Sequence, residues 1–177
     1  MQHIEASNSN PASKKYREII TKAVCGNAKK FFILSQFIEL PEGQSPTDVL
    51  GTTITKLQLT NNTGISEAMA MQEPGINISG TFEIHVWYAH KNGKATDVAR
   101  QNVQFEKIIP INEFEKGIIS MVDAKVEIIK SPECLESTIT MDNKIKIDVE
   151  LGVYAEIIGE TKVSVCIYQP NGEDDDD

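Results

Sequence analysis

The chain has 177 residues and a mass of 19.6 kDa, which is the size of one ordinary domain. Hydrophobic residues make up 40% and charged residues 24%, so there is enough apolar material for a core and a wholly disordered chain is excluded. The 26 acidic and 17 basic side chains give a net charge of −9, which disfavours nucleic acid and anionic membranes as partners. No apolar run approaches the ~18 residues of a membrane-spanning helix, so no membrane insertion is expected.

The two ends of the chain differ in composition from its middle. Residues 1–15 are polar, lack the basic start and apolar centre of a secretion signal, and are predicted to be a flexible leader. Residues 170–177 include the run Glu173–Asp177 and are predicted to be a flexible acidic tail. Residues 16–169 are expected to form a single domain. The odd number of cysteines fits free thiols in a reducing cytoplasm.

Period-two alternation of apolar and polar residues dominates the middle of the chain. It is clearest over Lys144–Val153, where every second side chain from Ile145 is apolar. In chain order the predicted strands are Ile19–Val24, Phe31–Leu40, Thr52–Leu59, Thr81–Ala89, Val98–Ile109, Ala124–Ile129, a weaker one over Leu135–Met141, Lys144–Val153 and Thr161–Ile167. In the last of these, Val163, Val165 and Ile167 are predicted to point inward.

Turns and helices complete the prediction. Lys91–Lys94 and Asp142-Asn143 are typical of hairpin turns, because Asn and Gly accept positive φ. Pro46–Leu50 could form one helical turn and Ile65–Gln72 a short helix, while Tyr16–Ala23 fits either helix or strand. Many short strands with almost no helix indicate an all-β fold: an antiparallel β-sandwich or a barrel-like domain with at most short helices.

Two groups of apolar side chains are candidates for an oligomer interface. Phe31, Ile33 and Phe37 share one face of their strand, and the opposite face is also apolar. Such a strand is either central in the sandwich and covered on both sides, or one of its faces meets another subunit. Trp87 alternates with Glu83 and His85 rather than with the apolar residues of its strand, so it is predicted to be exposed, as interface anchors often are.

No pattern in the sequence indicates catalysis, a cofactor or a metal. No cysteine or serine lies within a nucleophile signature, and there is no phosphate-binding glycine motif. His85 and His90 are five residues apart and fall on opposite faces of one strand, which disfavours a zinc site. Cys134 and Cys166 are expected to be structural or exposed thiols, Cys134 facing away from Leu135. A secondary hypothesis is that these two thiols crosslink chains when reducing conditions end.

Four segments in order resemble the outer spore coat protein E (CotE) family of endospore-forming bacteria. They are Tyr16–Val24, Ile84–Tyr88, Ser131–Glu136 and Val153–Val163, and Leu50-Gly51 also falls where the family has this pair. Together they cover roughly residues 16–168. The resemblance implies a morphogenetic scaffold without enzymatic activity, located in the spore coat and synthesised in the mother-cell cytoplasm. It further implies that the chain associates with itself and with other coat proteins, including an inner-coat anchoring protein.

Two other classes of function remain open from the sequence. A small carbohydrate-binding β-sandwich would need exposed aromatic rings that converge with Asn and Asp on one surface, and Trp87 alone does not meet this requirement. An enzyme would need a convergent cluster of titratable side chains, which the sequence does not indicate. The leading hypothesis is therefore a self-assembling structural protein.

Overall fold

The computed structural model describes residues 15–60, 64–66, 75–111, 113–115 and 118–167. These residues contain strands and turns and no helix. The strands are β1 (Lys15–Ile38), β2 (Pro46–Leu59), β3 (Gly64–Ser66), β4 (Gly75–His90), β5 (Ala95–Pro110), β6 (Glu113–Phe114), β7 (Ile118–Ile139) and β8 (Ile145–Ile167). The all-β prediction is confirmed. The expected acidic tail, the expected leader apart from Lys15, and most of the expected helix Ile65–Gln72 lie outside the described residues. Lys15 is the first residue of β1 rather than part of a leader.

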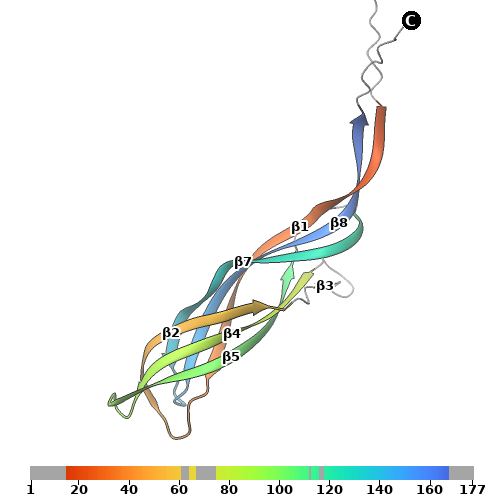
Figure 1. Ribbon diagram of the computed structural model, residues 1–177. Helices are drawn as coiled ribbons and strands as arrows, with labels where there is room; N and C mark the ends of the chain where they lie inside the picture. Colours follow the sequence, from red (N-terminus) through yellow and green to blue (C-terminus); the bar gives the residue numbers. More distant parts are fainter. Residues whose placement is uncertain (1–14, 61–63, 67–74, 112, 116–117, 168–177) are drawn as a thin grey trace, which may run out of the picture.

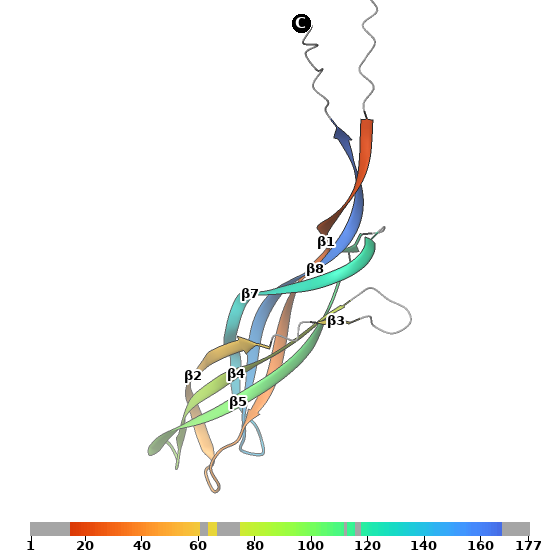
Figure 2. The same cartoon turned by 45° about the vertical axis from the view of Figure 1, so that its right-hand side comes forward.

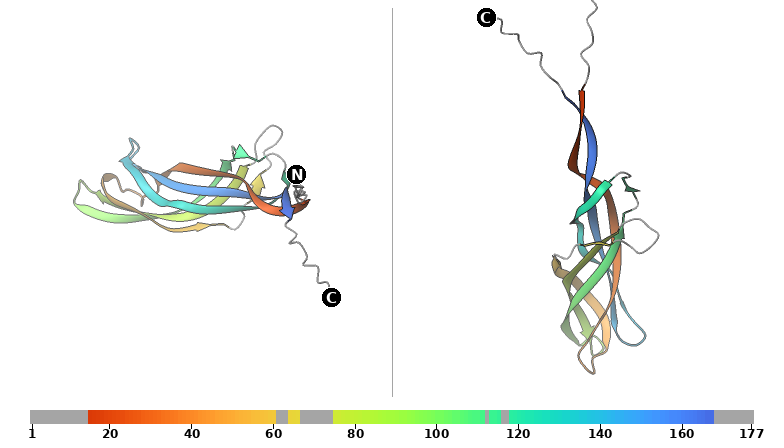
Figure 3. Two further views of the ribbon diagram at one scale, coloured as in Figure 1. Left: turned by 90° about the horizontal axis from the view of Figure 1, so that it is seen from above. Right: turned by 90° about the vertical axis from the view of Figure 1, so that its right-hand side faces the viewer.

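The strands form two antiparallel sheets that pack against each other and do not close into a barrel (Figure 1). Sheet A has the order β6-β1-β8-β7, in which β6 contributes only two residues beside Gly26 and Asn27. Sheet B has β4 at its centre, with β5 on one side and β2 and the short β3 on the other. Figure 3 shows the two layers one over the other. Each sheet therefore has an inner face and an outer face.

The core lies between the central strands of the two sheets. On β8 every second residue from Ile145 to Ile157 is fully buried, as the alternation over Lys144–Val153 predicts. β4 supplies the opposing layer through Ile76, Ile78, Phe82, Ile84, Val86 and Tyr88, which are also buried. β8 and β4 thus provide most of the core, and the strands beside them have more exposed side chains.

β1 and β8 continue beyond the other strands as a two-stranded ribbon (Figures 1 and 2). Their pairing runs from Ile38 opposite Ile145 to Lys15 opposite Ile167, with one register shift between Val24 and Gly26. β7 pairs with β8 only as far as Thr161, so the last residues of β8 pair with β1 alone. At ~3.3 Å per residue, the 23 residues of β8 are long enough to cross the sandwich and project from it. We use the word ribbon for residues 15–24 of β1 and 158–167 of β8.

A narrow junction separates the ribbon from the sandwich. β1 has an irregularity between Val24 and Gly26, where Cys25 is the extra, buried residue. On the paired strand Gly159 leaves no space for a side chain: an added Cβ would lie 2.7 Å from the Cys25 Sγ and 2.9 Å from the Ile118 Cγ2. The sequence predicts two strands here, Ile19–Val24 and Phe31–Leu40. They are one strand, because a single-residue bulge lets pairing with β8 continue on both sides.

Both predicted hairpin turns are confirmed. In the β4–β5 turn Asn92 and Gly93 have φ values of 56° and 79°, and the Lys94 amide donates to the Lys91 carbonyl at 3.3 Å. In the β7–β8 turn Asn143 has a φ of 59°, and its amide donates to the Thr140 carbonyl at 3.1 Å. These turns set the register that buries alternate residues of β4 and β8.

Two local predictions are wrong. Pro46–Leu50 is the start of β2 rather than a helical turn, because these residues pair with the end of β4 and a proline is tolerated as the first residue of a strand. Along β7 the predicted alternation fails because of five register shifts, one of them between Cys134 and Glu136. This bulge leaves Leu135 exposed and turns the Cys134 side chain toward the core instead.

The expected inward position of Val163, Val165 and Ile167 is also not what the structure shows. They continue the inner-face alternation of β8, but they lie on the ribbon, where no strand of sheet B faces them within the described ranges. Val163 is exposed, and the other two are half-buried. Alternation therefore identifies the face correctly, but it contains no information about where the opposite sheet ends.

Candidate functional site

The described residues contain no cluster of side chains that could hold a metal ion. Among them, no three His, Cys, Asp or Glu side chains lie close enough to hold a metal ion. His90 points into the core beside the Tyr88 ring, while His85 lies on the outer face of β4. Nor does that part of the chain include a helix long and apolar enough to cross a membrane.

The outer face of β1 exposes three large apolar side chains, which we call the outer patch: Phe31, Ile33 and Phe37. They are 47%, 57% and 52% exposed, while Leu34 and Ile38 on the opposite face are buried. The alternative of a strand covered on both faces is therefore wrong, since these three side chains are about half exposed. That a second subunit covers the patch stays a prediction.

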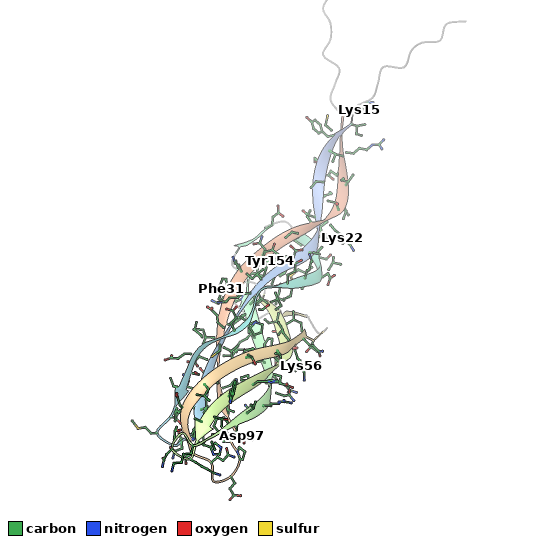
Figure 4. All side chains as sticks on the ribbon, turned by 60° about the vertical axis from the view of Figure 1, so that its left-hand side comes forward. Lys15, Lys22, Phe31, Lys56, Asp97 and Tyr154 are labelled. Carbon is green, nitrogen blue, oxygen red and sulfur yellow. The ribbon has the colours of Figure 1, made fainter. Side chains whose placement is uncertain are left out.

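The Phe31 ring lies flat against the neighbouring strand. Its partner in register is Gly152 of β8, and a Cβ added there would lie 2.6 Å and 2.8 Å from two of the ring carbons. The Lys29 ammonium is 5.5 Å from the ring centroid, within the range of a cation–π contact. Figure 4 labels Phe31 near the middle of the molecule, close to Tyr154 of β8. Gly152 thus leaves the space that the Phe31 ring occupies.

Beside the outer patch, β8 and β7 carry an excess of negative charge. Glu133 lies directly opposite Glu150, and Glu136 directly opposite Asp148. Like charges directly across a sheet are destabilising. Two lysines offset part of the repulsion: Lys130 bonds Glu150 and lies 3.7 Å from Glu133, and Lys146 lies 2.9 Å from Asp148. Four carboxylates and two ammonium groups leave this lane, which we call the acidic lane, with two uncompensated negative charges.

Hydrogen bonds fix the charges of the acidic lane. The Ser35 hydroxyl donates to Asp148 at 2.5 Å and, with the Lys146 ammonium, lowers the pKa of that carboxyl. The bond to Glu150, together with the nearby charge of Glu133, raises the pKa of Lys130. Both shifts favour the charged forms of Asp148 and Lys130.

Trp87 lies on the outer face of sheet B, on the side of the molecule opposite the outer patch. It is 54% exposed, whereas Phe82, Ile84, Val86 and Tyr88 of the same strand are buried, so the predicted orientation is confirmed. Its neighbours in register are Gly51 on β2 and Val98 on β5. A shallow hollow of about 430 Å³ opens beside the ring, lined also by His85 and Arg100. Its role as an interface anchor stays a prediction.

A charged cluster on β2 and β4 adjoins Trp87. The Lys56 ammonium lies 3.0 Å from Glu83, which also bonds His85, and these two contacts, that of Lys56 foremost, lower the pKa of the Glu83 carboxyl. Lys56 has a φ of 55°, in the bulge where the register of β2 shifts between Thr55 and Gln58. The bulge turns its side chain toward Glu83, so this surface is compensated in charge.

The two faces of the ribbon differ in charge. One face carries Lys15, Arg17 and Ile19 on β1 opposite Ile167, Val165 and Val163 on β8; we call it the basic ribbon face. The other face pairs its charges, since the Lys162 ammonium lies 2.5 Å from Glu18, and Lys22 is directly opposite Glu160. Among the described residues, Lys15 and Arg17 have no acidic partner within 4.0 Å. Figure 4 labels Lys15 at the tip of the ribbon and Lys22 farther along it, towards the sandwich.

The three cysteines lie in different environments. Cys25 is buried at the junction, and its thiol donates to the Ala23 carbonyl at 3.2 Å. Cys134 is half-buried, and burial raises the pKa of its thiol, which lowers the fraction of reactive thiolate. Cys166 is exposed on the ribbon. Crosslinking by Cys134 or Cys166 stays a prediction, and the position of Cys166 suits it better.

Sequence reasoning finds the outer patch and Trp87 but misses the acidic lane and the basic ribbon face. The acidic lane depends on the register shifts between β7 and β8, which place Glu133 and Glu136 beside the acids of β8. The ribbon has one sequence indication. The alternation of β8 spans 23 residues, about twice the usual upper length of a strand.

Comparison with known proteins identifies the family of this chain. The model of the family "Outer spore coat protein E (CotE)" matches residues 15–177. The chain belongs to the CotE family. No curated protein and no solved structure matches it. The resemblance stated from the sequence is confirmed, and the matched residues include both the sandwich and the ribbon. CotE proteins are structural proteins of the outer spore coat, and that is the location the family gives for this chain.

Proposed function

We propose that this CotE protein is a self-assembling scaffold of the outer spore coat that also holds other coat proteins in place. The observation that carries the proposal is the exposure of the outer patch. Three large apolar side chains on one strand face, each about half exposed, are more than the isolated apolar residues of an ordinary surface. Burial of this patch against another chain would remove apolar area from water and favour association.

Many copies of a weak contact between chains could together hold an assembly. A chain that offers more than one contact surface can be held in a lattice by several interfaces, each too weak to be stable alone. The outer patch and Trp87 lie on different sheets, so both can be occupied at the same time. In this proposal the protein is made in the mother cell, reaches the spore through an inner-coat anchoring protein, and has no enzymatic activity.

The competing hypothesis of a carbohydrate-binding module has less support. Such a module gathers its exposed aromatic rings on one surface. Here Phe31 and Phe37 lie on sheet A, Trp87 on sheet B and Tyr16 on the ribbon. No two of these three surfaces converge on one ligand.

The proposal predicts that the full chain forms species larger than a dimer at micromolar concentration. Sedimentation velocity over a dilution series measures this directly, and electron microscopy of the same samples shows whether the product is a ring, a filament or a sheet. A single 19.6 kDa species at every concentration would refute self-assembly.

A further inference from the structure

The basic ribbon face continues the core-facing side of sheet A, but sheet B does not cover it. From Ile145 to Ile157 the inner face of β8 is covered by sheet B, and the same alternation continues to Val163, Val165 and Ile167 on the ribbon. Past the junction at Gly159, no strand of sheet B lies over it in the described structure (Figure 2). The partner strand adds Lys15 and Arg17, which have no acidic partner within 4.0 Å in the part of the chain that the structure describes. An occupant of this face must therefore offer apolar area beside negative charge.

The outer face of sheet A has this composition. Its β1 lane is the apolar outer patch, and the adjoining acidic lane on β8 and β7 has two uncompensated negative charges. The ribbon face has a basic lane on β1 and an apolar lane on β8. Neighbouring strands are ~4.8 Å apart in every sheet, so when the apolar lane of the ribbon lies over the outer patch on β1, its basic lane lies over the adjacent β8. The acids of β7 are then one strand farther away, and the long side chains of Lys15 and Arg17 are needed to reach them.

We propose, resting on the self-assembly proposed above, that the basic ribbon face of one copy docks on the outer face of sheet A of a second copy. Val163, Val165 and Ile167 pack on the outer patch. Lys15 and Arg17 meet Glu133 and Glu136, the two exposed acids of the acidic lane. The occupant is a second copy of this chain because the two surfaces complement each other in charge and in the position of their apolar lanes.

Pairing of two ribbons through the same face does not satisfy the charges. It would bring Lys15 and Arg17 of both copies together, and the described residues of this ribbon face include no acid on either side. The proposed contact instead joins two different surfaces of the same chain. A row of chains joined by such contacts has a free ribbon at one end and a free acceptor face at the other. Further copies can therefore add to both ends, unless the rotation between successive copies closes the row into a ring.

Charge reversal tests the contact on the full chain. Lys15→Glu/Arg17→Glu alters the ribbon, and Glu133→Lys/Glu136→Lys alters the acceptor. Each double variant alone is expected to need at least about tenfold more protein for half-maximal assembly, since like charges across an interface are costly. An equimolar mixture of the two double variants is expected to recover assembly, because each ribbon then meets a surface of opposite charge.

Two further variants separate this effect from net charge. A chain carrying all four reversals keeps the net charge of −9 and is expected to assemble like the wild type. Lys91→Glu/Lys94→Glu changes the net charge as much as the ribbon variant does, but in the exposed β4–β5 turn, and is expected to leave assembly unchanged. Unchanged melting temperatures of the double variants establish that they are folded.

The result that overturns the inference is wild-type assembly by either double variant, or failure of the mixture and of the fourfold variant to assemble. If the acceptor variant alone assembles normally while the ribbon variant does not, the ribbon docks elsewhere and the inference is wrong. A wild-type chain that is monomeric throughout refutes the proposed function itself, which is a distinct outcome from loss of this one contact.

Discussion

Replacement of Gly152 by alanine should test how the outer patch is built. In the structure an added Cβ would lie 2.6 Å from a ring carbon of Phe31 and 2.9 Å from the Cβ of Lys130. The lysine Cβ is fixed by its backbone, so the aromatic ring must lift away from β8. Gly152→Ala is therefore expected to destabilise the monomer, although alanine is otherwise the better residue in a strand.

The magnitude follows from the contact area of the ring. Fully buried aromatic side chains remove roughly 150–250 Å² from water, and Phe31 is 47% exposed. About half of that area, roughly 100 Å², is worth about 2.5 kcal/mol at ~25 cal/mol per Å². Replacement of glycine in a strand returns about 0.5–1 kcal/mol. The net loss expected for Gly152→Ala is about 1.5 kcal/mol in the free energy of unfolding.

Chemical denaturation below the concentration of assembly measures this loss, and two controls make it specific. Gly51→Ala, also on an outer sheet face, places its Cβ in open space and should stabilise by about 0.5–1 kcal/mol. In a Phe31→Ala background Gly152→Ala should cost less than in the wild type, because the ring is gone and only the contact with the Lys130 Cβ remains. If Gly152→Ala is as favourable as Gly51→Ala in the wild-type background, the Phe31 ring does not lie on Gly152 and the reasoning is refuted.

Two further predictions concern the surfaces. Trp87→Ala should cost the monomer less than the ~3–5 kcal/mol typical of a core aromatic such as Phe82, yet weaken assembly by ~2 kcal/mol; unfolding of the variant, or wild-type sedimentation, would contradict it. Asp148 has a pKa held below its ordinary 3.8 by Ser35 and Lys146, so its contribution to stability is present above that pH and is lost as the pH falls through the lowered value. Asp148→Asn should flatten the acid decline in melting temperature, and an unchanged decline would show that the hydrogen bonds have no such effect.

The sequence predicts those parts of the fold that depend on local chemistry. The alternation from Ile145 and the turn residues Asn92 and Asn143 are sufficient to predict a strand and two turns, because each of these structures is determined by a few consecutive residues. They yield the all-β class, the core face of β8 and the outward position of Trp87. The outer patch follows from the same alternation, once β1 is known to have an uncovered face.

The sequence does not predict those features of the fold that depend on how neighbouring strands pair. A bulge of one residue at Cys25 joins two predicted strands into one, and another at Leu135 exchanges the faces of β7. Neither bulge has a distinctive residue pattern, since pairing with the neighbouring strand rather than local propensity creates it. The acidic lane and the basic ribbon face both depend on these registers, which is why residue patterns alone do not predict them.

The in-register end of the ribbon has a mechanical consequence. Lys15 and Ile167 lie directly opposite each other, so β1 and β8 leave the sandwich side by side and end at the same point. A pull on the docked ribbon loads both strands in the same direction and does not slide one past the other. Tension is then borne by two covalent backbones in parallel, while the hydrogen bonds between them are neither sheared nor peeled open. If copies are joined as proposed above, such ribbons would act as links that resist extension, because their strands are already close to the full length of the chain.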